Sequence, residues 1–452
     1  MPSISKLATR IRDGRATAEG LVEQCLSVIA DRDREINAFI SVLDDEARAR
    51  ARQADREIAG GRDLGLLHGI PLSVKDLLDL RGFPTTAASR VRTGHCATAD
   101  AEVVARLRSA GVVFIGKCNL HEFAFGTTGE ESAFGPTRNP HALGHVAGGS
   151  SGGSAASVAG GMAVGSVGTD TGGSIRIPAA ACGVVGLKPT FGELSCEGIV
   201  PLSPTLDHVG PLGATVDDVA TMYRAMAGHV VAVGEGPIGM RGADDRPPAR
   251  LALVRPYFLD VLDDQVRQVF ERAMDHLRGG GYTISEVAIP KAEAIAATYR
   301  NTVLYEALRV HGPTLESRAR NYSPGVRQRL EMGRTVSTGD YGRAQQSRER
   351  LRREVDVGLE GVSALVLPTL PIPAPPLGTH SLDVDGSAHE IRALTLRLTQ
   401  LFDLTGHPAI SLPCGLTELG LPCGIQLVGR LDHTLDLLAV AAQCERILGE
   451  HR

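Results

Sequence analysis

Residues 148–190 read GGSSGGSAASVAGGMAVGSVGTDTGGSIRIPAAACGVVGLKPT, and this stretch decides which fold the chain adopts. It contains two Gly/Ser loops, residues 148–154 and 170–176. Between them lie a run of small residues (154–161), which predicts a closely packed helix, and an apolar run (163–167), which predicts a strand. Loops in this order suit convergence at one edge of a sheet, where the sites of α/β proteins usually lie.

Outward from this stretch, apolar runs alternate with amphipathic segments. The expected strands are residues 38–42, 70–74, 112–115, 163–167, 184–187, 251–254 and 364–367. The expected helices cover residues 102–110, 154–161 and 435–448, three segments before residue 62, and most of residues 265–360. This alternation predicts an α/β fold with a large mixed, mostly parallel β-sheet covered by helices on both faces.

The chain shows no internal repeat and no linker long enough to force two independent domains. We therefore expect a single domain over residues 1–452. It comprises an N-terminal helical layer (1–62), a core (63–225), a mainly helical substrate-side region (250–360) and a C-terminal return to the sheet (361–452). The polar, Pro/Gly-rich residues 234–248 predict a surface connection between the middle two.

Composition excludes several classes of protein. With 47 basic and 52 acidic residues the formal net charge is -5, which argues against a surface that coats nucleic acid. There is neither a signal-peptide pattern nor an apolar run long enough to span a membrane, so we expect a cytoplasmic protein without membrane association. The eight cysteines are scattered, which predicts buried thiols in a reducing compartment rather than a disulfide framework.

Three short patterns resemble known binding motifs without fulfilling them. GVVFIGKC (residues 111–118) is nearly a phosphate-binding loop, but its interior is strand-like. GEGPIG (residues 234–239) is followed by no helix on which a dinucleotide's phosphates could sit. His121-Glu122 opens a zinc-protease pattern that Phe125 breaks. We therefore expect neither a metal nor a cofactor.

A fourth pattern, G-x-S-x-G at residues 149–153, fits a nucleophile elbow and leaves one alternative open. It would make Ser151 the nucleophile of an α/β-hydrolase esterase that uses a histidine. Such an elbow needs an apolar strand directly before it. Residues 138–149 (RNPHALGHVAGG) are loop-like instead.

The second Gly/Ser loop suits acyl transfer. Gly172 and Gly173 permit successive backbone amides to turn toward the oxygen of a carbonyl that the neighbouring Ser174 attacks. A serine hydroxyl needs a base, and no histidine is evidently tied to these loops. Lys75 ends the apolar run GIPLSVK, and burial would lower its pKa far enough for it to act as that base.

Residues 148–190, with GIPLSVKD (69–76), TLDHVGPL (205–212), GHPAISLPCG (406–415) and LPCGIQLVGR (421–430), resemble the amidase-signature family. The resemblance implies that Ser174 is the nucleophile, Ser150 the bridging residue after a cis Gly149-Ser150 peptide, and Lys75 the base. It also implies an oxyanion hole made by the backbone amides of four consecutive residues, Thr171, Gly172, Gly173 and Ser174. Supporting roles fall to Ser151, Asp170 and Arg176.

The same resemblance implies an amidase that hydrolyses C–N bonds of small amides, carbamates, ureas or esters, with a homodimer as the family habit. Phe123, Phe125 and Phe134 lie in a segment that runs near the site in the family, and they are candidates for an apolar pocket. The alternative within the family is the A-type component of a glutamine-dependent tRNA amidotransferase, which needs a partner. Its Asp-Gly-Val/Ile-Arg segment has no equivalent here, and Cys196 replaces an arginine of the usual Ser-Arg-x-Gly pattern.

Overall fold

The computed structural model describes residues 1–233 and 250–450, and within them eleven strands form one sheet. Their order across the sheet is β1-β3-β2-β6-β8-β7-β14-β15-β11-β9-β10. The strands are β1 (Phe39–Val42), β2 (Pro71–Lys75), β3 (Val113–Cys118), β6 (Gly165–Asp170), β7 (Val185–Lys188), β8 (His208–Gly213), β9 (Arg250–Val254), β10 (Thr283–Val287), β11 (Ala364–Pro368), β14 (Ala409–Leu416) and β15 (Pro422–Val428). Two small ribbons pair β4 (Arg138–Asn139) with β5 (Ala142–Val146) and β12 (Ser381–Val384) with β13 (Ser387–Glu390).

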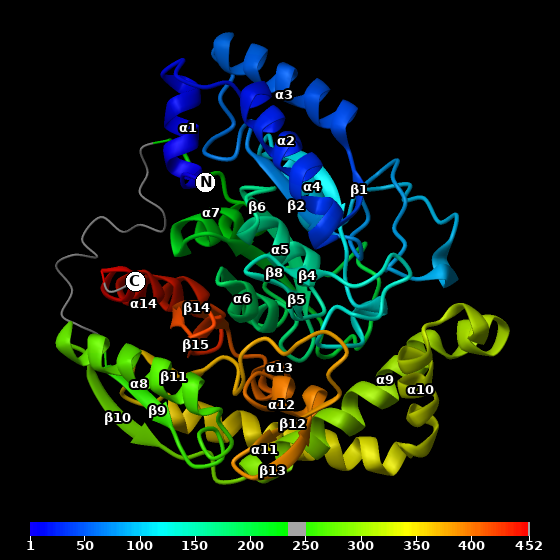
Figure 1. The fold of residues 1–452 in the computed structure, drawn as a ribbon, viewed down its shortest axis with the longest axis vertical. Helices are drawn as coiled ribbons and strands as arrows, with labels where there is room; N and C mark the ends of the chain where they lie inside the picture. The colour runs from blue at the N-terminus through cyan, green and yellow to red at the C-terminus, as the bar shows by residue number, and fades with distance from the viewer. Residues whose placement is uncertain (234–249, 451–452) are drawn as a thin grey trace.

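Helices surround the sheet, and Figure 1 shows α1–α3 at one end of the molecule and α8–α11 at the other. The helices of the described residues are α1 (Ile4–Arg12), α2 (Ala18–Ile36), α3 (Asp44–Ala59), α4 (Glu102–Ser109), α5 (Gly152–Ala159), α6 (Arg176–Cys182), α7 (Val216–Met226), α8 (Asp264–Gly279), α9 (Ile295–Arg318), α10 (Pro324–Met332), α11 (Thr338–Gly358), α12 (Ile391–Arg397), α13 (Gln400–Thr405) and α14 (Thr434–Gly449). One apolar cluster joins α2, α3, α5 and α6, whereas α4, α7 and α14 pack into a second, larger cluster.

The sheet is mixed, as the sequence predicts, but the expectation that it is mostly parallel was wrong. Only β3–β2, β2–β6, β11–β9 and β9–β10 pair in parallel, and the other six neighbouring pairs of the described sheet are antiparallel. The reason is visible at β14 and β15, which are joined by residues 417–421 alone. So short a connection permits only an antiparallel neighbour, because a parallel one needs a crossover of a dozen residues or more.

The predicted small-residue helix is α5, and its composition follows from how closely it approaches the chain around it. A Cβ added to Gly153 would lie 2.3 Å from the carbonyl oxygen of Ala38 and 2.4 Å from that of Asn119. Neither backbone atom can move aside cheaply, so the helix tolerates no side chain at this point. This packing holds the first Gly/Ser loop firmly against the sheet.

Several other expectations can be compared with the described residues. Residues 113–118 of the near phosphate-binding pattern form β3, as expected. The region 265–360 is mainly helical (α8–α11) but also contains β10, which the sequence pattern did not predict. Residues 234–239 (GEGPIG) and the predicted surface connection at 234–248 lie outside the described residues. Among the helices that the structure describes, none is long and apolar enough to cross a membrane. The single-domain organisation stays a prediction.

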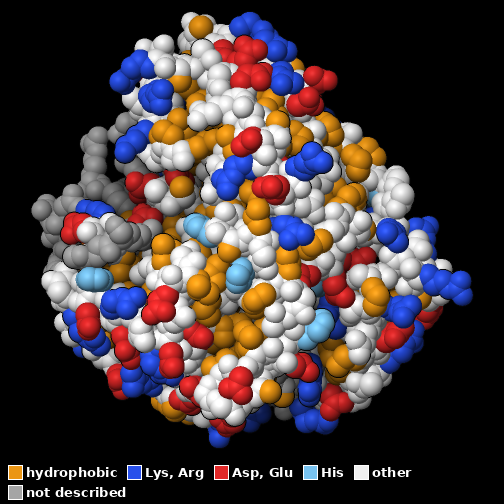
Figure 2. All heavy atoms as spheres, viewed as in Figure 1, with side chains coloured by type: hydrophobic (Ala, Val, Ile, Leu, Met, Phe, Trp, Pro, Cys, Tyr) orange, Lys and Arg blue, Asp and Glu red, His pale blue; other side chains and the backbone are white. Residues whose placement is uncertain are grey.

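The surface seen in Figure 2 carries both signs of charge, intermixed over the upper and lower parts of this face. Hydrophobic side chains lie among them in small groups. All eight cysteines are free thiols, and Cys25, Cys118, Cys182, Cys423 and Cys444 are buried.

Candidate active site

The sheet itself brings the two predicted loops to the lysine. Strands β2 and β6 are parallel neighbours with Val74 opposite Val167, so both end at the same edge of the sheet. Lys75 is the last residue of β2, and β6 ends at Asp170, directly before the second loop. The first loop reaches this edge because Ser151 precedes α5, which packs on β2 and β6.

Lys75 is fully buried, and its side-chain nitrogen faces three hydroxyl groups. Nζ lies 2.7 Å from Ser150 Oγ, 2.8 Å from Ser151 Oγ and 2.7 Å from Thr169 Oγ1. Three hydroxyl neighbours match an ammonium with three N–H donors, and they equally match a neutral amine with two N–H donors and one lone pair. The site therefore accommodates both protonation states of Lys75.

The hydrogen bonds of Ser151 exclude its hydroxyl group as the donor to the lone pair of a neutral Lys75. Ser151 Oγ donates to the carbonyl oxygen of Thr169 at 3.0 Å, so it accepts, rather than donates, at Lys75. The Ser150 hydroxyl is then free to direct its hydrogen at Nζ. Its loop departs from ordinary backbone geometry, because the Gly149-Ser150 peptide is cis.

Lys75 has no carboxylate as a direct partner among the described residues. Asp76, its neighbour in sequence, forms an ion pair with Lys117 at 2.8 Å instead. Burial lowers the pKa of Lys75 to about 7, although Asp170 and Asp207 oppose this effect. A substantial fraction of the lysine is therefore neutral near neutral pH, as a general base requires.

Ser174 lies on the second loop, where its own backbone holds the first loop in place. Its carbonyl oxygen accepts the N–H of Ser151 at 3.2 Å, which ties the two loops together. The residue is only 5% exposed. Within the described residues no hydrogen bond occupies its hydroxyl group.

The four amides expected to form an oxyanion hole do not all point the same way. The N–H of Gly173 donates to Asp170 Oδ1 at 2.6 Å, so this amide is already used. The amides of Thr171, Gly172 and Ser174 have no acceptor among the described residues. The expectation is therefore corrected at Gly173: three free N–H groups remain on the loop, because the carboxylate of Asp170 folds back onto the fourth.

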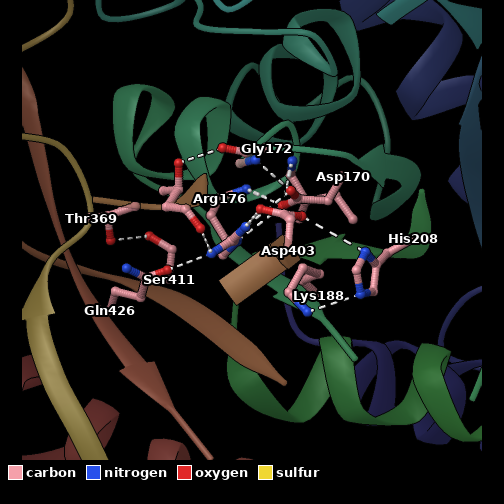
Figure 3. Close-up of polar contacts among 12 residues, drawn as sticks. Asp170, Gly172, Arg176, Lys188, His208, Thr369, Asp403, Ser411 and Gln426 are labelled. Carbon is pink, nitrogen blue, oxygen red and sulfur yellow. Dashed lines mark hydrogen bonds and ion pairs between the residues drawn. The ribbon is translucent and has the colours of Figure 1, made fainter. Parts of the chain in front are cut away.

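Behind the loop, Arg176 binds two carboxylates and two further acceptors (Figure 3). Its guanidinium lies 3.0 Å from Asp170 and 2.6 Å from Asp403, and it donates to the carbonyl oxygen of Thr399 and to Gln426 Oε1. Burial opposes ionisation of Asp170, but Arg176 outweighs it and holds the pKa of this carboxyl well below its usual range. Asp170 in turn accepts from the amides of Gly173 and Ile175, so the charge cluster fixes the loop beside Ser174.

Replacing Arg176 by methionine should lower the free energy of unfolding by about 3–5 kcal/mol, because it leaves a carboxylate buried without its cation. Urea unfolding followed by circular dichroism measures this change. Arg343 is the matched control: its side chain is 72% exposed, and Arg343→Met should change stability by less than about 0.5 kcal/mol. Equal stability of both variants would contradict a structural role for the cluster.

A cavity of about 260 Å³ adjoins the second Gly/Ser loop and the end of β6. Its wall includes Thr171 of the loop and Thr169, which contacts Lys75. The rest is mainly apolar: Leu77, Ala124, Cys196, Ile199, Val200, Pro201, Leu202 and Pro204, together with Asp207 and His208. Cys196, which stands where the resemblance described above leads us to expect arginine, therefore helps to make this wall apolar.

None of the three phenylalanines proposed as pocket residues lines this cavity. Phe123 is buried and packs against His311 and Tyr322, and Phe134 is 44% exposed. Phe125 is buried beneath Arg329 and Arg392. Their spacing in sequence could not show that they point in three different directions.

Some residues of the site were missed from sequence. Thr169, the third neighbour of Lys75, is the residue before Asp170 in the strand that leads into the second loop. It belongs to no motif that we identified in the sequence. Gln426 lies in the segment GIQLVGR, and only that segment pointed to it. Asp403 had no signal at all, because it reaches Arg176 from 227 residues further along the chain.

Ser151 does not match the esterase alternative. The strand before it, β5, belongs to a small ribbon outside the main sheet, and the loop-like residues 147–150 separate β5 from Ser151. The hydrogen-bond partners of its hydroxyl group are Lys75 and Thr169, and none is a histidine. In the described residues no group of three His, Cys, Asp or Glu side chains is arranged to hold a metal ion.

The geometry can be set beside known proteins. A family model described as Amidase matches residues 20–434. The chain belongs to the amidase family. It is similar to the A component of the glutamyl-tRNA(Gln) amidotransferase of Symbiobacterium thermophilum, with 36% identity covering 100% of this chain and 98% of that protein. This membership makes the protein an amidase-family hydrolase that acts on C–N bonds.

Two solved structures of the amidase family are similar to this chain to different degrees. A crystal structure of an amidase superposes with a TM-score of 0.92 at 37% identity, covering 98% of this chain and 99% of that one. The A component of the glutamyl-tRNA(Gln) amidotransferase of Thermotoga maritima superposes with a TM-score of 0.76 at 32% identity, covering 94% and 90%. The amidase fold, with its mixed sheet flanked by helices, is therefore shared across both kinds of protein.

Proposed function

We propose that this amidase-family enzyme hydrolyses small linear amides by itself, using Ser174 as nucleophile, Ser150 as proton relay and Lys75 as base. The observation that carries the proposal is the buried Lys75, whose nitrogen lies 2.7 Å from Ser150 Oγ. A lysine is rarely buried without an ion-pair partner unless it has a task. Here burial lowers its pKa to about 7, which suits a base.

The chemistry follows in two stages. Neutral Lys75 accepts the proton of Ser150, Ser150 accepts that of Ser174, and Ser174 Oγ forms a bond to the carbonyl carbon. The charge that develops on the carbonyl oxygen is stabilised by the free amides on the loop of residues 171–174. The relay returns the proton to the leaving nitrogen as the C–N bond breaks. Water then hydrolyses the acyl-enzyme by the same relay.

Two observations favour a free-standing amidase over a component that depends on a partner. The likeness to the amidase structure is higher than that to the Thermotoga maritima amidotransferase component, with TM-scores of 0.92 and 0.76. The helical region after residue 295 also lacks the Asp-Gly-Val/Ile-Arg segment that marks the amidotransferase component. The competing proposal is that the chain is the A component of an amidotransferase. It is supported by the 36% identity, over the whole chain, to such a component.

Release of ammonia or amine from a panel of small amides, anilides, ureas and carbamates tests the proposal. The purified chain alone should turn over at least the simple amides, and the best substrate should define the size of the acyl group. If the chain is inactive alone but gains activity when the other amidotransferase components are added, the competing function is supported instead. Inactivity under both conditions contradicts both proposals.

A further inference from the structure

A second cavity, of about 670 Å³, lies beside the loop that carries Ser150. Thr127 and Thr128 line it. A Cβ placed on Gly149 would lie 2.9 Å from the backbone of both threonines, so the cavity wall touches the residue before Ser150. This cavity is charged, in contrast to the apolar one beside Thr171.

Most of its charged groups already have partners. Glu131 forms an ion pair with Arg329 and a hydrogen bond with His121, the latter at 3.1 Å. Glu130 accepts the backbone N–H of Gly378 at 2.6 Å. These groups build the wall of the cavity and are engaged there.

Arg392 is different. It is partly buried at the start of α12 and lines the cavity, yet its guanidinium has neither an ion pair nor a hydrogen bond within residues 1–233 and 250–450. Its only marked contact there is with the ring of Phe125, whose centroid lies 5.4 Å from Cζ. Burial lowers the pKa of Arg392 to about 10, and nearby Arg329 adds to this effect, whereas Tyr299 and Glu131 oppose it. A partly buried guanidinium without a direct carboxylate partner gains from an anion that a ligand brings within hydrogen-bond distance.

The position of Arg392 relative to the reacting centre follows from α12. Leu396 is four residues further along the helix, so both side chains lie on one face, roughly 6 Å apart at their Cβ atoms. Leu396 Cδ2 lies 3.0 Å from the point where a Cβ on Gly172 would be, and the Tyr299 hydroxyl lies 2.3 Å from it. Tyr299 also interacts electrostatically with Arg392. The backbone of Arg392 therefore lies about one helical turn from Leu396, which packs against Gly172 of the second Gly/Ser loop.

We propose that Arg392 binds a carboxylate on the acyl part of the substrate, so that the preferred substrates are short amides that also carry a carboxylate. The proposal rests on the amide hydrolysis proposed above. A guanidinium can hold a carboxylate by two parallel hydrogen bonds, which fixes its orientation as well as its position. With its carboxylate held there, we expect the acyl chain to direct the scissile carbonyl toward Ser174.

The test compares substrates that differ only at the far end. In succinamate a carboxylate replaces the terminal methyl group of butyramide, and in glutaramate it replaces that of pentanamide. We expect kcat/KM to be about 10–100-fold higher for the carboxylate member of each pair. In Arg392→Gln this ratio should fall to near one. Arg327→Gln is the matched control, because Arg327 is exposed and pairs only with Glu331 among the described residues, and it should keep the wild-type ratio.

Two results would overturn the assignment. One is a wild-type ratio near one, or a ratio that survives in Arg392→Gln. The other is a preference for 4-aminobutyramide over butyramide, which would assign the cavity to an ammonium group held by its acidic residues Glu130 and Glu390.

A binding measurement separates this inference from the proposed activity. In Ser174→Ala, calorimetric titration with succinamate should give a Kd at least about tenfold lower than that for butyramide, and the added Arg392→Gln change should remove the difference. This result would support the carboxylate site even if no amide were hydrolysed. Equal affinities would refute the site even if hydrolysis were observed.

Discussion

Ser174→Ala should reduce kcat for amide hydrolysis by at least about 10⁴-fold, because the substitution removes the proposed nucleophile. The loop geometry should survive, since the carbonyl of Ser174, which accepts the N–H of Ser151, is unchanged by the substitution. Substrate binding should therefore change little while turnover is lost. Initial rates and calorimetric binding, measured on the same preparation, separate the two effects.

Ser285→Ala is the matched control, because Ser285 is exposed on β10, far along the sheet from β6. It should leave kcat unchanged. A slowly turned-over ester should also add its acyl mass to the peptide that contains Ser174 in the wild type and not in the variant. Near-normal turnover by Ser174→Ala, or acyl mass on Ser151, would refute the assignment.

Lys75→Met should lower kcat by about 10²–10⁴-fold, the usual contribution of a general base. In the wild type, kcat/KM should fall about tenfold per pH unit well below pH 7 and level off above it. The sign follows from the base: its pKa is lowered to about 7, so below that pH Lys75 binds a proton and loses the lone pair that accepts from Ser150. Measurements of kcat/KM from about pH 5 to about pH 9 give this pH profile.

Lys188 is the necessary comparison, since burial lowers its pKa to about 7 as well. Its nitrogen lies 3.2 Å from His208 Nε2 (Figure 3). Its other hydrogen bond among the described residues is to the carbonyl oxygen of Pro189, so it contacts no serine of the site. Lys188→Met should therefore keep the acid limb of the profile, even if its kcat is reduced. Loss of that limb in Lys188→Met would transfer the titration from Lys75 to Lys188.

The sequence by itself determined the residues that meet at the sheet edge. Lys75 ends an apolar strand, Ser150 lies just before the small-residue helix, and Ser174 follows a second strand, the parallel neighbour of the first. Glycine runs likewise marked the two loops, because only such residues permit their backbone paths. The motifs and their order predicted the amidase family, and the match of the family model to residues 20–434 confirms that prediction. The catalytic roles themselves stay a proposal.

Only the tertiary structure decided how the site is supported and shaped. Asp403 and Gln426 reach Arg176 across 227 and 250 residues of chain, and no local pattern encodes so distant a contact. For the same reason the sequence did not predict three other features. These are the antiparallel majority of strand pairs, the use of the Gly173 amide by Asp170 and the different surroundings of the three phenylalanines. Local sequence sets which elements form, whereas strand partners and side-chain neighbours depend on the packing of segments far apart in the chain.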